Sequence, residues 1–315
     1  MEFKVYQMNK INSDQVIPSV IDGLILFHIT EDRSYNVLDQ LSIKNRIPAD
    51  IMIISFDDID SELVKSIQNK YKLNVFLVRI ETDLSEDLLD CLRAVNNYLA
   101  LKNVIGIDIS CMPIPIFIRF MHFLFNKHSG IQLIIYYSEP THYNLNNLFD
   151  FSAYSGEIDI KAIPGYEGKT SKLDESQRII FYIMGFELDY LNKLIPQETN
   201  PDDIVPINGF PSYFPKYKDI SLINNNFNFH EKNIQIIFAE ANNPFAIYNQ
   251  MVLLMNKNSK YCIDIIPAGP KPMALGACLF ALKNGNNDIR ILFPFPSEYK
   301  SKQSSGKGAI WEYII

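Results

Sequence analysis

The chain repeats one local pattern: a short run of apolar residues, a turn, and then a longer segment with helical periodicity. The clearest example is Tyr261–Asn284, where an apolar run breaks at Pro267 and Lys271-Pro272 opens an apolar-periodic helix. Strands buried on both faces read as continuous apolar runs, and their alternation with helices is typical of a parallel sheet. The sequence therefore predicts a doubly wound α/β fold with right-handed crossovers.

The pattern occurs in two series. In the first series the expected strands are 23–29, 50–56, 73–80, 104–109 and 131–137, and the expected helices are about 30–41 (with Thr30 as N-cap), 61–71, 85–101 and 114–126. In the second series the expected strands are 178–184, 203–207, 234–239, 261–266 and 289–294, and the expected helices are 189–194, 213–224, 245–255 and 271–282. Residues 141–177 break the rhythm, with one expected strand at 158–163, and a last edge strand is expected at 309–315. A length of 315 residues suits two domains. We expect two tandem Rossmann-like sheets, in an N-terminal domain (1–150) and a C-terminal domain (151–315).

The two series also align with each other, at a shift of about 156 to 160 residues. The alignment places Glu31 over Glu187, Glu81 near Glu240, Pro113 over Pro272 and Glu139 over Glu298. Any two strand–turn–helix series share their apolar periodicity, but shared periodicity explains less well an acidic residue that recurs after corresponding strands. The sequence therefore predicts an internal duplication.

Composition narrows the class of protein. The net charge of −7 argues against general nucleic-acid binding, which needs a basic surface, but leaves room for a single nucleotide. There is no apolar run long enough to span a membrane and no signal-peptide pattern, so we expect no membrane association and a cytoplasmic location. The four widely spaced cysteines are expected to be buried small residues, and neither they nor the scattered histidines predict a metal site.

The turn Gly269-Pro270-Lys271-Pro272 is the sharpest local signal for a ligand. Ligands of open α/β sheets bind beyond the carboxyl ends of the strands, and this turn follows such a strand. Pro272 suits the first helical turn, Gly269 allows backbone to approach a ligand, and the helix N-terminus favours an anion. Lys271 can supply a positive charge to a phosphate. The alternative is a helix-starting turn with a solvated lysine.

Other polar residues are expected at the same edge of the sheets. Asp108 and Ser110 end a strand of the first series, and an aspartate in an apolar run is expensive to bury unpaired, although a satisfied cap is the competing interpretation. The further candidates for ligand binding are Glu31, Asn242 and Asn243. Glu187, which follows Gly185-Phe186, can accept hydrogen bonds from ribose hydroxyls or face solvent.

Familiar cofactor and catalytic motifs are missing from the sequence. Neither G-x-G-x-x-G nor G-x-x-x-x-G-K-[ST] occurs, and neither do G-x-S-x-G and H-E-x-x-H. We therefore expect no dinucleotide cofactor, no Walker-type ATPase site and no metal. Ser304-Ser305-Gly306-Lys307 is interpreted as a flexible loop.

The segment IIPAGPKPMALGACLFAL (265–282) resembles the glycine-threonine-lysine-proline segment of CRISPR-associated Rossmann-fold (CARF) domains, and IDIS (107–110) resembles an acidic-x-serine strand end found in such folds. The resemblance implies recognition of a cyclic oligoadenylate through Gly269, Lys271 and Pro272. Pro270 stands where the family has threonine, which removes a hydroxyl and an amide donor. No nuclease motif follows the segment, so the resemblance implies a separate effector protein.

Three classes of function follow. The first is a non-catalytic nucleotide-recognition protein of prokaryotic type, a sensor or accessory subunit in antiviral defence, which binds a phosphate-bearing ligand and uses no cofactor. The second is a nucleotide or nucleoside hydrolase or transferase in which Glu187, Glu240 or Glu298 acts as general acid-base. The third is a structural or assembly partner. Formation of a homo-oligomer is compatible with each of them.

Overall fold

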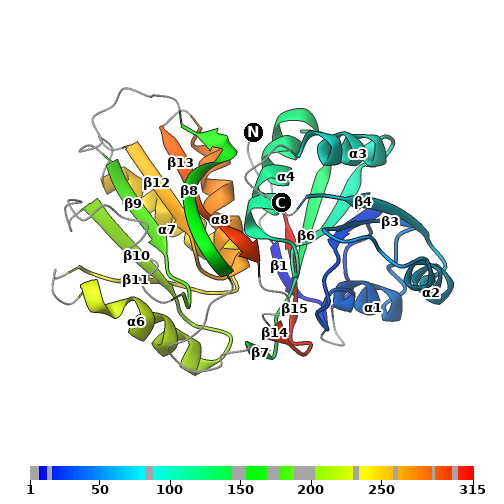
Figure 1. Ribbon diagram of the computed structural model, residues 1–315, viewed down its shortest axis with the longest axis horizontal. Coiled ribbons are helices and arrows are strands. Elements are labelled where there is room, and N and C mark those ends of the chain that lie inside the picture. The colour runs from blue at the N-terminus through cyan, green and yellow to red at the C-terminus, as the bar shows by residue number, and fades with distance from the viewer. Residues whose placement is uncertain are drawn as a thin grey trace. The chain divides into compact units, whose positions relative to one another are not determined.

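The computed structural model describes residues 7–12, 16–81, 88–143, 154–168, 178–187, 203–229, 234–257, 262–285, 288–299 and 304–315. The chain divides into two compact units (Figure 1). The first consists of Met1–Asn144 together with Ser301–Ile315, and the second of Leu145–Lys300. Each unit has a sheet of its own, and each is described by itself below.

The first unit contains a seven-stranded sheet in the order β1-β15-β6-β5-β2-β3-β4. Its strands are β1 (Gln7–Lys10), β2 (Gly23–Phe27), β3 (Asp50–Ser55), β4 (Asn74–Arg79), β5 (Val104–Asp108), β6 (Gln132–Ser138) and β15 (Ile310–Ile314). Strands β2 to β6 are parallel to one another, whereas β15 is antiparallel to β6 and β1 is antiparallel to β15. A separate antiparallel pair joins β7 (His142–Tyr143) to β14 (Ser304–Ser305).

The second unit contains a six-stranded sheet in the order β11-β10-β9-β12-β13-β8. Its strands are β8 (Tyr154–Glu167), β9 (Arg178–Ile183), β10 (Ile204–Gly209), β11 (Ile237–Ala239), β12 (Cys262–Pro267) and β13 (Ile289–Tyr299). Strands β9 to β13 are parallel, and only β8 is antiparallel, to β13. The parallel strands of both units therefore follow the same order, 3-2-1-4-5, with the first strand of the series at the centre. This order is that of a Rossmann-like doubly wound sheet, so the predicted α/β fold class is confirmed.

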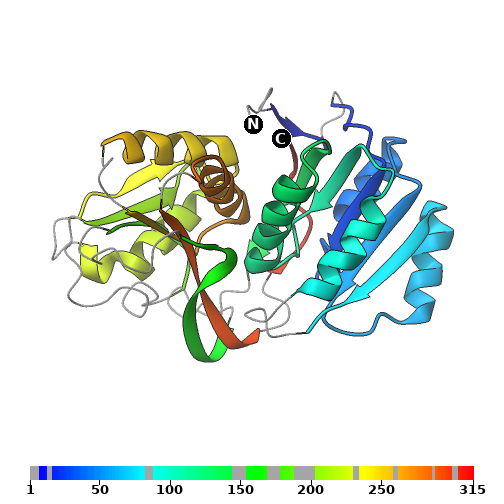
Figure 2. The same cartoon turned by 90° about the horizontal axis from the view of Figure 1, so that it is seen from above.

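Helices cover both faces of each sheet (Figure 2). In the first unit they are α1 (Asn36–Ile43), α2 (Ser61–Tyr71), α3 (Leu89–Leu99) and α4 (Ile114–Lys127). In the second unit they are α6 (Pro215–Phe229), α7 (Pro244–Lys257) and α8 (Lys271–Lys283). No described helix is both long enough and apolar enough to cross a membrane.

Burial explains why these segments fold as they do. Every residue of β2, β9 and β12 is buried, as expected for central strands that are covered on both faces. Helix α2 begins where the Asp60 side chain accepts a hydrogen bond from the backbone N–H of Glu62. Helix α8 is buried along nearly its whole length, from Pro272 to Ala281, so it belongs to the core of its unit.

The structure differs from the sequence-based expectations at two places, and a third expectation is not tested. Helix α1 begins at Asn36 with Tyr35 as its N-cap, so the prediction that Thr30 caps it was wrong. Strand β15 pairs with β6 and β1, so the last residues of the chain complete the first sheet and not the second. The helix expected at 189–194 lies outside the described residues.

A buried glutamate in β15 explains why this strand pairs with β6 and β1. Glu312 of β15 is fully buried, and its carboxylate accepts hydrogen bonds from the backbone N–H and hydroxyl of Ser19, from the Asn9 amide and from the Tyr136 hydroxyl. These bonds join β15 to β1, to β6 and to the segment ahead of β2. Because the donors belong to residues 176 to 303 positions away along the chain, no local pattern around Glu312 predicts these bonds.

Candidate functional site

The order of the parallel strands reverses between β9 and β12 in the second unit, and loops leaving these two strands meet beyond their carboxyl ends. Gly185 follows β9, and a Cβ atom on it would lie 2.0 Å from the carbonyl oxygen of Ala268, which follows β12. A Cβ atom on Gly269 would lie 2.7 Å from the Met184 carbonyl oxygen. Both glycines are thus required by the close approach of the two loops. This is the topological switch point, where ligands of open α/β sheets bind.

Helix α8 starts at this point. Its N-cap is Pro270, which has φ −57° and ψ 143°, and no side chain caps the first turn. Lys271 is the first helical residue and is half-buried, and Pro272 follows it in the buried part of the helix. Three of the predicted ligand-binding residues, Gly269, Lys271 and Pro272, therefore lie together at the switch point.

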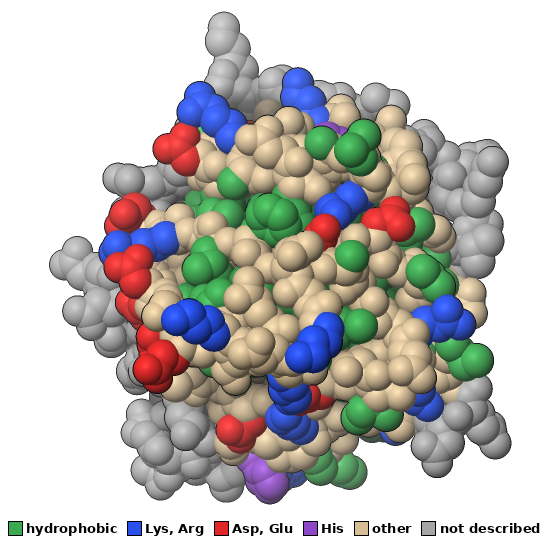
Figure 3. All heavy atoms as spheres, turned by 90° about the vertical axis from the view of Figure 1, so that its right-hand side faces the viewer, with side chains coloured by type: hydrophobic (Ala, Val, Ile, Leu, Met, Phe, Trp, Pro, Cys, Tyr) green, Lys and Arg blue, Asp and Glu red, His purple; other side chains and the backbone are tan. Residues whose placement is uncertain are grey.

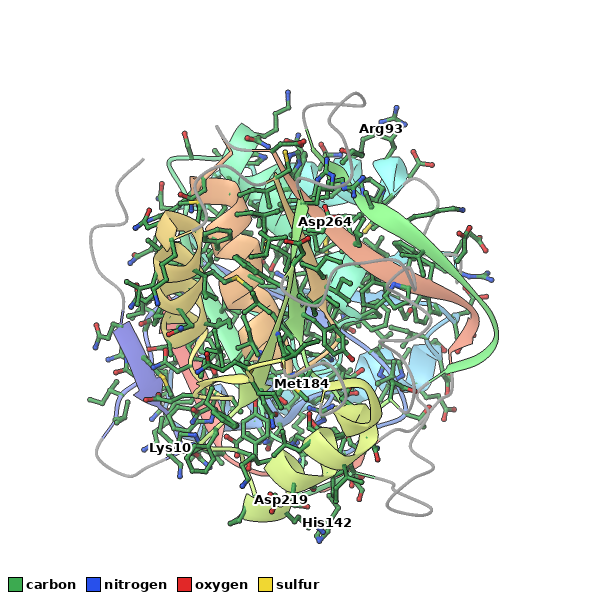
Figure 4. All side chains as sticks on the ribbon, turned by 90° about the vertical axis from the view of Figure 1, so that its left-hand side faces the viewer. Lys10, Arg93, His142, Met184, Asp219 and Asp264 are labelled. Carbon is green, nitrogen blue, oxygen red and sulfur yellow. The ribbon has the colours of Figure 1, made fainter. Side chains whose placement is uncertain are left out.

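The loop after β9 is held by α6. The Asn225 side-chain amide donates to the Gly185 carbonyl oxygen at 3.0 Å, and its Oδ1 accepts from the Tyr182 hydroxyl at 2.7 Å. Asn224 donates through Nδ2 to the Phe186 carbonyl oxygen at 2.6 Å. In Figure 4, Met184 lies at the end of β9 that faces α6, on which Asp219 is labelled. The sequence analysis missed the role of α6, and its only signal was the polar run Asn224-Asn225-Asn226 inside a helix.

Aromatic rings surround the same loop. The Phe186 ring centroid is 5.3 Å from that of Tyr217 on α6, and Tyr217 is 5.4 Å from Phe214. Phe210, which directly follows β10, is half-exposed, and its ring carries the Lys218 ammonium at 5.7 Å from the centroid. The carboxyl ends of β9 and β10 thus present aromatic surface beside the Lys218–Asp219 ion pair.

Glu187 ends the described part of the loop. It lies four residues beyond the last residue of β9, and only 9% of its surface is exposed. Burial raises the pKa of the Tyr182 hydroxyl, and the negative charge of Glu187 raises it further. The Glu187 carboxylate therefore acts electrostatically on the hydroxyl that donates to Asn225.

The corresponding edge of the first unit is filled by its own side chains. Glu31 accepts hydrogen bonds from the Arg33 guanidinium at 3.1 Å and from the backbone N–H and hydroxyl of Ser304 at 3.1 and 2.8 Å. Arg33 also donates to the Ser138 carbonyl oxygen at 3.0 Å. Residues 304–307, which were expected to form a flexible loop, therefore lie over this strand end, where Ser304 donates two hydrogen bonds to Glu31.

Asp108 and Ser110 belong to this closed edge. Asp108 Oδ1 accepts from the backbone N–H of Ser110 at 2.9 Å and from the Ser110 hydroxyl, and the Ser110 hydroxyl accepts from the backbone N–H of Ser138 at 2.7 Å. Both side chains are buried. These contacts match the satisfied-cap alternative, which joins the ends of β5 and β6.

Asn243 and Glu240 act at the start of α7. Asn243 Oδ1 accepts from the backbone N–H groups of Phe245 and Ala246, and its amide donates to Glu240 at 2.9 Å. Asn243 is thus a helix cap, and Glu240 is exposed beside it. Asn242, between them, is half-buried.

Two of the three predicted catalytic carboxylates, Glu240 and Glu298, lie in or directly after strands that are far apart in the sheet. Glu240 follows β11 and Glu298 lies in β13, and these strands are four strand spacings apart, or roughly 19 Å. In addition, Glu298 belongs to the part of β13 that pairs only with β8, beyond the segment paired with β12. The side chain of Glu298 lies outside what the structure describes. Carboxylates that share one reacting bond lie within about 10 Å of each other, so Glu240 and Glu298 cannot form such a pair.

All four cysteines are buried and none is paired, as the sequence predicted. Burial raises the pKa of the Cys278 thiol to about 12, so it stays protonated at neutral pH. Among the described residues, no group of three or more His, Cys, Asp or Glu side chains is placed to hold a metal ion. On the face shown in Figure 3, acidic and basic side chains occur side by side.

No protein-family model matches this sequence, and no curated protein matches it. Among solved structures, it is similar to a universal stress protein from Archaeoglobus fulgidus DSM 4304, with 8% sequence identity. The alignment covers 86% of this chain and 95% of that chain, with a TM-score of 0.24. A TM-score this low carries no argument about function, and the fold assignment above depends on the strand order alone.

Proposed function

We propose that the protein is a non-catalytic nucleotide-recognition protein whose ligand binds at the carboxyl edge of the second sheet. The phosphate lies at the start of α8, against Lys271 and the first-turn backbone. The observation that carries the proposal is that Lys271 opens a helix without a side-chain cap at the switch point between β9 and β12. A lysine there opposes the helix dipole, and a bound anion reverses that penalty.

The contrast between the two units supports this choice of site. In the first unit the equivalent helix α4 also starts after an N-cap proline, Pro113, with the same φ of −57° and ψ of 143°, but its first residue is the apolar Ile114. The neighbouring strand end is filled by the Glu31–Arg33 ion pair and Ser304. Helix α8 starts with a lysine, whereas α4 starts with an apolar residue, so we assign one ligand per chain.

The aromatic rings near the switch point suit the base of a nucleotide. Phe210, which is 51% exposed, and the half-buried Phe186 offer faces on which a base can stack, and stacking accepts any base because every base has a π-face. A narrower proposal is that the protein senses a cyclic oligoadenylate and acts through a separate effector protein. The only additional support for it is the resemblance of residues 265–282 to CARF domains.

Isothermal titration calorimetry with AMP, ATP, cyclic tetra-adenylate and inorganic phosphate tests the proposal. Lys271→Ala is expected to weaken binding by about 10- to 100-fold, the value of a charge-assisted hydrogen bond to phosphate. Lys257→Ala is the matched control, because it removes the same charge from the exposed end of α7. Absence of binding by all four compounds, or full binding by Lys271→Ala, would overturn the proposal.

The same samples separate recognition from catalysis. After incubation, chromatography should recover each nucleotide unchanged. Product formation that is lost in Glu187→Gln would instead favour a hydrolase or transferase with Glu187 as general acid-base.

A further inference from the structure

Helix α6 carries two buried polar atoms that have no hydrogen-bond partner. They are Oγ of Ser221 and Oδ1 of Asn224, in side chains of residues that are 3% and 2% exposed. One other described side-chain atom shares this property, Oδ1 of Asp50, but it lies 2.8 Å from the Lys102 ammonium and so has its charge compensated. Leaving a buried polar group unpaired costs free energy, and native structures rarely do so without a reason.

The two side chains lie on the same side of α6. Residues three apart in a helix lie on the same side, so Ser221 and Asn224 are neighbours along α6. Asn224 is bonded through Nδ2 to the Phe186 carbonyl oxygen at 2.6 Å, which places this side of the helix against the loop after β9. That loop is one of the two that meet at the switch point.

The orientation of Asn224 is fixed by its contact. Reversing the side-chain amide would turn Oδ1 toward the Phe186 carbonyl oxygen and set two acceptors against each other. The unpaired atom is therefore an acceptor. Its neighbour Asn225 cannot supply a donor, because its Nδ2 donates to the carbonyl oxygens of Gly185 and Ser221 and its Oδ1 accepts from Tyr182.

These atoms select the chemistry of an occupant. Asn224 Oδ1 needs a donor, and a phosphate at neutral pH presents mainly acceptors, so a phosphate does not fit there. A pair of neighbouring hydroxyl groups fits both atoms: one hydroxyl donates to Asn224 Oδ1, and the other exchanges a hydrogen bond with Ser221 Oγ. The half-buried Phe186 ring, whose centroid is 5.3 Å from that of the buried Tyr217, provides apolar surface on the same loop for the face of a sugar ring.

We infer that Ser221 and Asn224 bind the vicinal diol of a ribose, so that the second unit selects ribonucleotides over deoxyribonucleotides. This inference depends on the proposed nucleotide site and adds the residues that choose the sugar. The phosphate remains at Lys271, on the other loop of the switch point.

Calorimetry with two matched pairs of compounds tests the inference: AMP against 2′-deoxy-AMP, and ribose 5-phosphate against 2-deoxyribose 5-phosphate. The wild-type protein should bind each ribose compound about tenfold more tightly than its deoxy partner, the value of one well-made hydrogen bond. In whichever of Ser221→Ala and Asn224→Ala removes the partner of the 2′-hydroxyl, the ratio should fall to near one, whereas the other variant should weaken both members of each pair alike. Affinity for 2′-deoxy-AMP should stay unchanged in the variant that abolishes the ratio, since that ligand lacks the hydroxyl that the deleted group binds.

Ser212→Ala is the matched control, because its hydroxyl is exposed and already donates to the Phe214 carbonyl oxygen. Ser221→Ala should melt at or above the wild-type temperature without ligand, since it deletes an unsatisfied group, so loss of the fold does not obscure the result. Equal affinities within each wild-type pair, or a ratio that survives both substitutions, would overturn the diol assignment and leave the phosphate site in place. Failure of all four compounds to bind would overturn the nucleotide site itself, and the diol assignment with it.

Discussion

Glu31 and Glu187 lie at the same distance beyond corresponding strands, four residues after the ends of β2 and β9, and both are buried, at 8% and 9% exposure. Their surroundings differ. Glu31 is bonded to Arg33 and Ser304, whereas Glu187 ends the described part of the loop that α6 holds, and its charge acts on the Tyr182 hydroxyl. Corresponding glutamates thus differ in role: Glu31 closes a strand end of the first unit, and Glu187 lies at the candidate ligand site of the second.

Glu31→Gln is expected to destabilise the protein by about 2–4 kcal/mol without changing ligand affinity. The substitution leaves the buried Arg33 guanidinium without its carboxylate. Removing one partner of a buried ion pair is strongly destabilising, because the other charge stays buried. Urea unfolding measures the first effect and calorimetry with AMP measures the second. A folded Glu31→Gln protein that has lost binding would show that the first sheet also contributes to the site.

Gly185→Ala is expected to destabilise the second unit by about 1–3 kcal/mol and to weaken ligand binding. The new methyl group would overlap the Ala268 carbonyl oxygen, and the two loops of the switch point would have to move apart. Thermal unfolding and calorimetry provide the measurements. Gly285→Ala is the control, because the nearest atom to its added methyl group is 3.7 Å away; equal effects of the two variants would contradict the packing argument.

Asp39 should make the first unit sensitive to acid. Burial alone would raise the pKa of Asp39, but hydrogen bonds from Lys70, Tyr71 and Lys307 outweigh it and lower the pKa to about 2, from an ordinary value of 3.8. Stability from these contacts is therefore complete above pH 4 and is lost as the pH falls toward 2. Because the pair with Lys70 is open to solvent, we expect about 1 kcal/mol from it.

Acid titration followed by circular dichroism checks this expectation. Wild type and Asp39→Asn should differ in stability at pH 5 and converge by pH 2. A constant difference across that range would show that Asp39 titrates no differently in the folded and unfolded chain.

Glu312→Gln is expected to cost about 1–3 kcal/mol of folding free energy. The carboxylate accepts from four donors, and an amide in its place would present N–H groups to at least one donor pair. Chemical denaturation measures the loss. Asn12→Ala, which removes a peripheral bond to the backbone N–H of Ile310, is the control and should cost less.

Much of the fold was readable from the sequence because its strands are buried on both faces. The prediction for 61–71 matches α2 at both ends, and the expected strands 50–56 and 104–109 exceed β3 and β5 by one residue each. The pairing of β15 was not readable, because Glu312 meets donors that are about 176 to 303 positions away along the chain. Tertiary contacts of this kind leave no local period.

The candidate site was readable only in part. The residue types of Gly269-Pro270-Lys271-Pro272 predicted a turn ahead of a helix, and the place of this turn at the switch point follows from the strand order. Asp108 and Ser110 looked equally polar in sequence, but they satisfy each other. Ser221 gave no signal and Asn224 only the polar run Asn224-Asn225-Asn226, since a serine and an asparagine in a helix ordinarily face water.

The duplication stays a prediction, although the structure changes its register. Pro113 and Pro270 are the matching N-caps, so Pro113 corresponds to Pro270 and not to Pro272, and Pro115 corresponds to Pro272. The common strand order does not require a common origin, because Rossmann-like sheets share it.

The pairing of β15 with β6 sets an order of assembly on the ribosome. The second unit is continuous in sequence and can complete its sheet while the first still lacks the strand that lies between β1 and β6. Until residues 310–314 emerge, β6 keeps an open edge and the Tyr136 hydroxyl has no carboxylate to meet. The half of the chain made first is therefore the half that finishes folding last.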